Sequence, residues 1–85
     1  MQKHTRVYYK YFDYGMDDVI LCEVCGSPAV DIHHLDGRYK KDSNNIEKLI
    51  ALCRLHHDDA HANKLTKEQL LTIHERTIKL HNHKF

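Results

Sequence analysis

The most regular hydrophobic pattern of the chain lies near its C-terminal end. There the apolar positions recur three and four residues apart, at Leu70, Leu71, Ile73 and Ile78. This spacing is that of one face of an α-helix. Thr66 followed by Gln69 matches a capping box, and Leu65 with Leu70 matches the hydrophobic staple that accompanies one. The pattern therefore predicts a helix over residues 67–81, which we expect to pack against the N-terminal segment.

The middle of the chain predicts two strands and a helix. Residues 29–34 largely alternate apolar and polar side chains and contain β-branched residues, as strands do. Residues 35–45 are polar and carry a Gly and an Asx cluster, which predicts a long loop. Residues 46–52 predict a second strand, and residues 54–62 a helix. The fold class expected from this order is α+β.

The N-terminal segment is rich in aromatic residues between basic ones. The apolar positions are Val7, Tyr8, Tyr9, Tyr11, Phe12 and Tyr14, interleaved with Lys3, Arg6 and Lys10. One interpretation is an arm that stacks on nucleic-acid bases and binds phosphate. The other, which average aromatic burial favours, is a cover over one side of a small core. A short helix over residues 5–12 fits both.

Length and composition set the limits of the fold. We expect 85 residues to form one small domain, 1–85, with a thin core that lacks Trp and needs an added constraint. The odd number of cysteines and the lack of an apolar N-terminal segment favour a cytoplasmic protein over a secreted, disulfide-bonded one. The apolar runs are too short for a membrane span. A net charge of +1 leaves DNA attraction to local basic residues.

All three cysteines occur in two knuckle-like pairs. Cys22-x-x-Cys25 is followed later in the chain by Cys53-x-x-His56. Thiolate and imidazole are ligands that suit a tetrahedral Zn²⁺ site, and a Cys-x-x-Cys turn lets two sulfurs converge on one ion. A free thiol pair or a redox Cys-x-x-Cys is the alternative. Two correctly spaced pairs favour a structural zinc site, and removal of its metal is expected to unfold the domain.

A second group of histidines lies in the same stretch. His57 and His61 are four residues apart and share one face of the expected helix. His33 and His34 are neighbours on the expected strand, so they point to opposite sides of it. One of the two can then face a metal while the other faces a water. The alternative is that all four lie on the surface of a zinc ribbon. The remaining histidines are expected to be exposed to solvent: His4, His74, His81 and His83.

Residues 22–61 resemble the HNH endonucleases of the ββα-metal (His-Me finger) superfamily in their zinc-knuckle form. The matching features are the two knuckles, the pair His33-His34 in DIHHLDGR, and the block LIALCRLHHDDAH. The segment VYYKYFDYG before the first knuckle is also similar to the lead-in of small phage and bacterial members. The resemblance implies a zinc-stapled ββα-metal unit, flanked here by an aromatic N-terminal segment and a C-terminal helix.

The resemblance also implies roles for individual residues. His34 matches the general base that activates a water for attack on a DNA phosphodiester; an imidazole suits that role because the unperturbed pKa of histidine, about 6.5, lies near working pH. His33, His57 and His61 match ligands of a single catalytic divalent ion. An imidazole-rich site favours Mn²⁺, Ni²⁺, Co²⁺ or Zn²⁺ over Mg²⁺. The chain departs from the family at Lys48, which occupies the position of the central Asn, fourteen residues after His34 and nine before His57.

The function expected from the resemblance is hydrolysis of DNA phosphodiester bonds by a monomer or weak dimer in a bacterial or phage-infected cell. An ammonium group has no acceptor, so Lys48 cannot reproduce the hydrogen bonds of an Asn; Asn44 or Asn45 would have to replace it, or Lys48 would contact phosphate. DNA-packaging proteins of phages are further expected partners. The alternative is a non-catalytic zinc module that binds DNA or protein, with a degenerate HNH site. The residues expected to contact phosphate are Arg38, Lys40, Lys41, Lys48 and Arg54.

Overall fold

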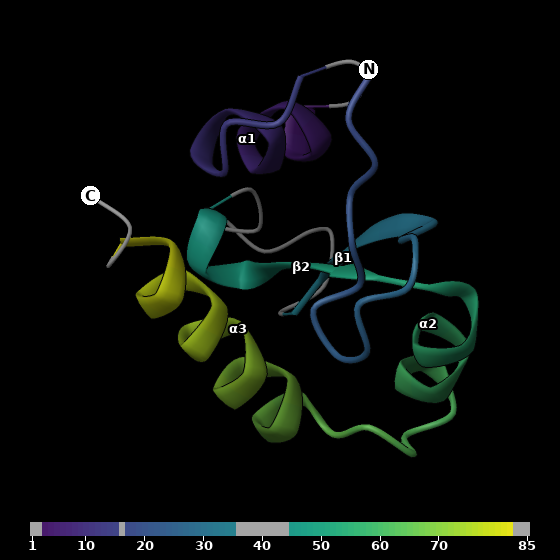
Figure 1. Cartoon of the computed structure of the whole chain (residues 1–85). Coiled ribbons are helices and arrows are strands. Elements are labelled where there is room, and N and C mark those ends of the chain that lie inside the picture. The colour runs from purple at the N-terminus through teal and green to yellow at the C-terminus, as the bar shows by residue number, and fades with distance from the viewer. Residues whose placement is uncertain (1–2, 16, 36–44, 83–85) are drawn as a thin grey trace.

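The computed structural model describes residues 3–15, 17–35 and 45–82. Within these ranges the elements are, in chain order, α1 (Lys3–Tyr11), β1 (Asp31–His34), the 3₁₀ helix η1 (Ile46–Lys48), β2 (Leu49–Leu52), α2 (Arg54–His61) and α3 (Lys67–Asn82) (Figure 1). The α+β class predicted from the sequence is confirmed. None of these helices is long and apolar enough to cross a membrane.

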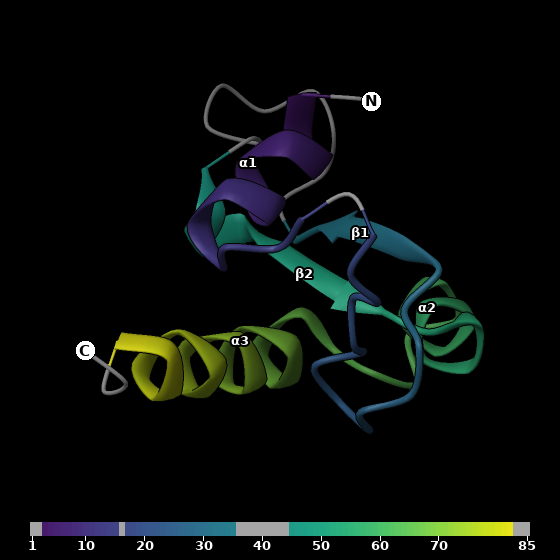
Figure 2. The same cartoon turned by 45° about the horizontal axis from the view of Figure 1, so that its top comes forward.

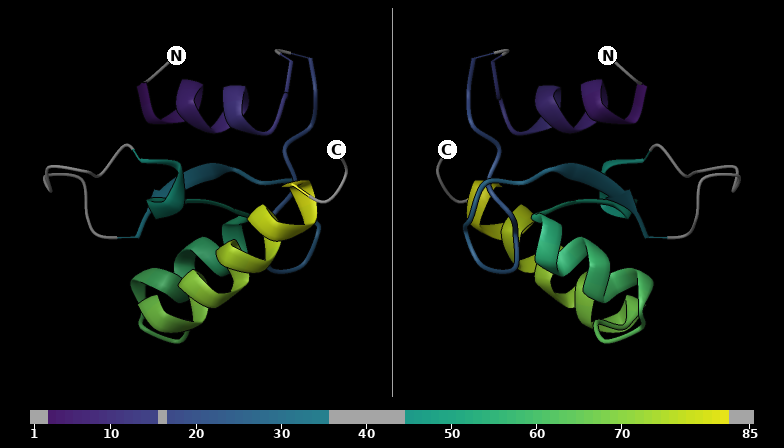
Figure 3. Two further views of the ribbon diagram at one scale, coloured as in Figure 1. Left: turned by 90° about the vertical axis from the view of Figure 1, so that its left-hand side faces the viewer. Right: turned by 90° about the vertical axis from the view of Figure 1, so that its right-hand side faces the viewer.

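The two strands form an antiparallel pair at the centre of the fold. Asp31 lies opposite Leu52, and His34 lies opposite Leu49. Helix α1 covers one face of this pair, while α2 and α3 lie on the other side (Figure 3). All four residues of β2 are buried, because both faces of the strand are covered. The strand pair therefore holds the layers together.

Side-chain alternation along β2 divides the core into two clusters. Ile50 and Leu52 pack with Leu70 of α3. Leu49 and Ala51 pack on the opposite face with Tyr8 of α1. This two-sided burial is expected when successive side chains of a strand point to opposite faces and both faces are covered. It explains why the second strand has a continuous apolar sequence.

The second strand is shorter than the sequence pattern suggested. Residues 46–48 form the 3₁₀ turn η1 instead of extending β2. The side chain of Asn45 accepts a hydrogen bond from the backbone N–H of Glu47 at 3.0 Å, and so caps this turn. Asx residues commonly compete in this way with strand pairing. Asn45 thus has a local capping role, while Asn44 lies outside the described residues.

The C-terminal helix begins as its sequence predicts. The backbone N–H of Thr66 donates to Oε1 of Gln69 at 2.9 Å, and the N–H of Gln69 donates to Oγ1 of Thr66 at 3.2 Å. This reciprocal pair is a capping box. At its other end the helix meets α1, where the hydroxyl of Tyr11 donates to Oδ1 of Asn82 at 3.2 Å. The predicted packing of α3 against the aromatic segment is therefore confirmed.

Two histidines that were expected to be exposed are buried. The exposed fraction is 6% for His4 and 1% for His74. The expectation was wrong because both histidines meet partners from far away in the chain: Glu23 and Ile46 for His74, and the ring of His34 for His4. His81 is half-buried, with its ring 5.1 Å from that of Phe12. His83 lies outside the described residues. The aromatic segment itself is part of the core, since Tyr8 is only 2% exposed.

Candidate metal centres

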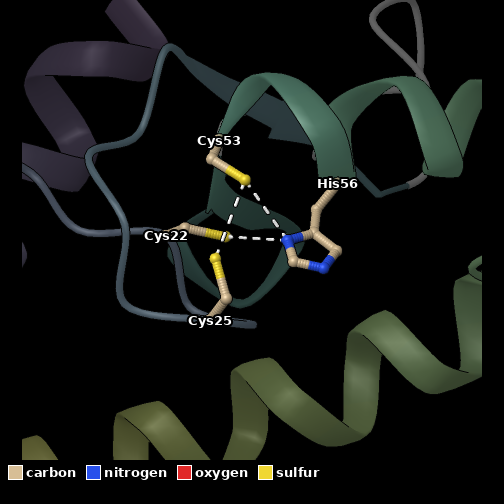
Figure 4. Close-up of side chains that lie close together, drawn as sticks. All are labelled: Cys22, Cys25, Cys53 and His56. Carbon is tan, nitrogen blue, oxygen red and sulfur yellow. Dashed lines mark hydrogen bonds between the residues drawn. The ribbon is translucent and has the colours of Figure 1, made fainter.

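Three cysteines and one histidine converge at the start of α2. Cys22 and Cys25 lie on the turn before β1, Cys53 directly precedes α2, and His56 lies in the first turn of that helix (Figure 4). Their four ligand atoms all lie within 4.8 Å of one another. Nδ1 of His56 is 3.2 Å from Sγ of Cys53 and 3.6 Å from Sγ of Cys22. The four residues can therefore hold one metal ion.

The turn that carries the first two sulfurs depends on a glycine. Gly26 has a φ of +80°, in the region that other residues rarely adopt. Its N–H donates to the carbonyl of Cys22 at 2.9 Å, and the N–H of Cys22 donates to the carbonyl of Ser27 at 2.7 Å. A bridge between Leu21 and Pro28 closes the turn. These backbone contacts orient both cysteines toward Cys53 and His56 in the folded chain.

The donor chemistry of this group suits Zn²⁺. Hydrogen bonds from Ser27 lower the pKa of the exposed Cys25 thiol to about 6, which favours the thiolate that binds metals. Burial raises the pKa of the Cys22 thiol, so a cation would be needed to keep that sulfur ionised. Three sulfurs with one imidazole form a common structural zinc set.

A second group lies farther along the same helix. His57 and His61 of α2 meet His33 of β1, and the ligand atoms of the three lie within 4.8 Å of one another. The Nε2 atoms of His57 and His61 are 3.3 Å apart. Helix α2 continues directly from the end of β2, so one short segment carries residues of both groups (Figure 2). The structure thus brings together the three histidines that the resemblance implies as ligands of one ion.

Asp31 stands beside this cluster, and the sequence analysis missed it. Its Oδ2 lies 3.2 Å from Nε2 of His57. Asp31 precedes His33 by two residues on β1, and residues two apart on a strand share a face. This alternation was the sequence signal that could have revealed it.

The surroundings of His33 favour its neutral imidazole. Burial lowers the pKa of His33, and the nearby rings of His57 and His61 lower it further. The carboxylate of Asp31 acts in the opposite direction, but it does not outweigh the burial. A neutral imidazole has the lone pair that a metal requires.

His34 lies on the other face of β1, as the alternation predicts. Its ring is 4.4 Å from that of His4 on α1. Its charge nevertheless contributes to lowering the pKa of His33, so the two side chains are electrostatically linked. Lys48 ends η1, and its backbone carbonyl accepts a hydrogen bond from the N–H of Leu35 at 2.8 Å. The residue directly after β1 is therefore held by the backbone of Lys48.

Comparison with known families places these centres in context. The family model for recombination enhancement, RecA-dependent nucleases matches residues 16–85. The chain belongs to this nuclease family. No curated protein and no solved structure gives a significant match. The matched range contains both metal-ligand groups but not α1, whose buried Tyr8 completes the core.

Of the residues expected to bind nucleic acid, the structure describes Lys48 and Arg54. Arg38, Lys40 and Lys41 lie outside the described residues. Nε of Arg54 is 3.6 Å from Oδ2 of Asp58 one turn later on α2, and both side chains are exposed. Such an exposed pair is weak and leaves Arg54 able to change partner.

A buried polar network links the Cys22–Cys25 turn to helices α1 and α3. Glu23 accepts a hydrogen bond from the hydroxyl of Tyr8 at 2.6 Å, and its Oε1 is 2.8 Å from Nδ1 of His74. Burial and then the charge of Glu23 raise the pKa of Tyr8, which keeps its hydroxyl protonated as a donor. Sequence reasoning missed this network because its members come from three distant segments.

Proposed function

We propose that this chain is a metal-dependent DNA endonuclease of the HNH type, which hydrolyses phosphodiester bonds. The observation that carries the proposal is the convergence of His33, His57 and His61, in a chain that belongs to a nuclease family. The second group, Cys22, Cys25, Cys53 and His56, supports it by fixing the N-terminal end of the helix that carries two of these histidines.

Each group has its own role in the proposal. The Cys₃His group holds a structural Zn²⁺, and the three histidines hold one catalytic divalent ion, Mn²⁺, Ni²⁺, Co²⁺, Zn²⁺ or Mg²⁺. Such an ion, when bound, stabilises negative charge on the scissile phosphate and its leaving oxygen. His34 acts as the general base: its half-buried ring at the end of β1 accepts the proton of the attacking water.

The substrate and partners follow from the family and from charge. DNA is the substrate, with Arg54 and Lys48 contacting phosphates together with Arg38, Lys40 and Lys41. The family description names RecA, and we propose that cleavage by this chain is directed to DNA that carries RecA. A single site cuts one strand per encounter, so a monomer or weak dimer would act as a nicking enzyme. DNA-packaging proteins stay a prediction from the resemblance alone.

The test is nicking of supercoiled plasmid by the zinc-loaded protein in Mn²⁺ or Ni²⁺, with and without a RecA filament on the DNA. We expect nicking by the wild type and none by His57→Ala. His34→Ala should lose about 10²–10⁴-fold in rate, the usual contribution of a general base. His81→Asn is the control, because His81 lies on α3 against Tyr11 and Phe12. Equal nicking by wild type and His57→Ala would refute the proposal.

One pair of observations favours the alternative of a non-catalytic zinc module. His34 packs against His4 on the face of β1 opposite His33, and Lys48 occupies the position of the central Asn of the HNH endonucleases that the chain resembles. DNA binding that is unaffected by His34→Ala, together with no nicking in any metal or with RecA, would establish this alternative.

A further inference from the structure

The position of Asp31 relative to the histidine cluster is set by the strand register. Asp31 and His33 lie two residues apart on β1, so their side chains emerge on the same face. That face meets α2, where His57 and His61 are one turn apart. A carboxylate is thus placed by the backbone beside three converging imidazoles.

The ring nitrogen of His57 that faces Asp31 decides whether Asp31 can be a metal ligand or only a group that orients His57. A carboxylate that orients a metal-binding histidine accepts a hydrogen bond from the ring nitrogen that does not bind the metal. Here Oδ2 of Asp31 lies 3.2 Å from Nε2 of His57. The same Nε2 lies 3.3 Å from Nε2 of His61. The carboxylate therefore stands on the ligand-nitrogen side of the His57 ring, not behind it, and next to the 4.8 Å group that the three histidines form.

The second oxygen of Asp31 is already engaged. Oδ1 accepts a hydrogen bond from the N–H of Ile32 at 2.9 Å. This contact orients the side chain and leaves Oδ2 directed toward His57. A ligand that is held in place before binding loses less conformational entropy when the ion arrives.

From this arrangement we infer that Asp31 is a fourth protein ligand of the ion at His33, His57 and His61, and that it adapts this site to Mn²⁺ and Mg²⁺. The inference rests on the proposed function and adds the choice of metal to it. Imidazoles alone suit Zn²⁺, Ni²⁺ and Co²⁺, whereas a carboxylate oxygen suits the harder Mn²⁺ and Mg²⁺. Three neutral imidazoles leave the charge of a divalent ion uncompensated. The carboxylate of Asp31 would balance part of that charge.

The test measures metal affinity, not cleavage. Protein with its Cys₃His group loaded with zinc is titrated with Mn²⁺, followed by the electron paramagnetic resonance signal of free Mn²⁺, and with Ni²⁺ by calorimetry. The variants are Asp31→Asn, which keeps the shape of the side chain, and Asp31→Ala. Asp58→Asn is the matched control, because Asp58 is an exposed carboxylate on α2 that pairs with Arg54. His57→Ala removes a histidine of the site.

We expect Asp31→Asn and Asp31→Ala to weaken Mn²⁺ binding about tenfold or more, and Ni²⁺ binding clearly less. Asp58→Asn should match the wild type for both metals. Unchanged Mn²⁺ affinity in both Asp31 variants would overturn the inference alone. An equal loss for Mn²⁺ and Ni²⁺ would also overturn it, since that pattern describes a group that only positions His57. Wild-type affinity no greater than that of His57→Ala would overturn both the inference and the proposed catalytic site.

Discussion

His74 and Glu23 form a buried ion pair that ties helix α3 to the first cysteine turn. Nδ1 of His74 lies 2.8 Å from Oε1 of Glu23, and the two side chains are 1% and 2% exposed. The other ring nitrogen, Nε2, lies 2.6 Å from the carbonyl of Ile46. Both partners are acceptors, so both ring nitrogens must carry hydrogen and the ring is an imidazolium. This pair fixes η1 and α3 against the Cys22–Cys25 turn.

Replacing His74 should therefore destabilise the fold strongly. His74→Ala leaves the carboxylate of Glu23 buried without its cation, and breaking one partner of a buried pair costs about 3–5 kcal/mol. Chemical denaturation at pH 7 with saturating zinc measures the loss. Glu75→Ala is the control, because Glu75 is exposed on the next position of α3 and such changes stay within about 0.5 kcal/mol. Equal stability of the two variants would contradict the role assigned to His74.

The same pair should make stability depend on pH. Burial disfavours the imidazolium of His74, but the hydrogen bond and charge of Glu23 outweigh it, and the carbonyl of Ile46 and the charge of Glu47 act in the same direction; together they raise the pKa of His74. A raised pKa in the folded state gives stability that is complete below the unfolded value, about 6.5, and is lost as pH rises through the folded value.

The measurable quantity is the difference in unfolding free energy between the wild type and His74→Gln. We expect this difference to be largest at about pH 6 and to shrink steadily as pH rises above 6.5. Taking the difference removes the pH dependence of zinc binding, which both proteins share. Tyr8 keeps its proton across this range, because burial and Glu23 raise its pKa. A difference that grows with pH would show that His74 is neutral in the fold.

An interaction in this fold could be predicted from the sequence where its partners lie close together in the chain. The capping box at Thr66 and the metal-ligand spacings are local patterns, so they were recovered from the sequence. Glu23 and His74 are 51 residues apart, and no local pattern predicts such a pair. Asp31 was missed although strand alternation places it on the same face as His33. The start of β2 was misplaced because Asn45 caps a 3₁₀ turn over Ile46–Lys48, a segment that was predicted as strand.

Metal removal should unfold the chain through the Cys₃His group. The two buried core clusters are small, and metal binding to such a group contributes directly to folding free energy. We expect a strong chelator to abolish the helical signal in circular dichroism and one Zn²⁺ per chain to restore it. Cys53→Ser should prevent refolding, because Cys53 is a buried member of the Cys₃His group and directly precedes α2. His57→Ala should refold like the wild type; failure to do so would show that the two groups are not independent.

Lys48→Asn should leave the rate of nicking at saturating DNA nearly unchanged, because the proposed phosphate contact of the Lys48 side chain acts on DNA affinity. The link between η1 and the end of β1 is the hydrogen bond from Leu35 N–H to the carbonyl of Lys48, and any residue at position 48 supplies that carbonyl. We expect less than about a threefold change in Lys48→Asn, well below the loss expected for His34→Ala. A large gain in rate would show that the Lys side chain, not the backbone, limits the position of His34.

Thr66→Ala should isolate the contribution of the capping box to α3. The change removes the acceptor for Gln69 N–H, and loss of such a cap costs about 0.5–2 kcal/mol. Thr72→Ala is the matched control: Thr72 is exposed within α3, and its hydroxyl donates to the carbonyl of Glu68 within the same helix. Alanine has the higher helix propensity, so this control should be neutral or slightly stabilising. Urea denaturation of both variants with zinc present makes the comparison, and equal losses would mean that packing of Leu65 and Leu70, not the cap, sets where α3 begins.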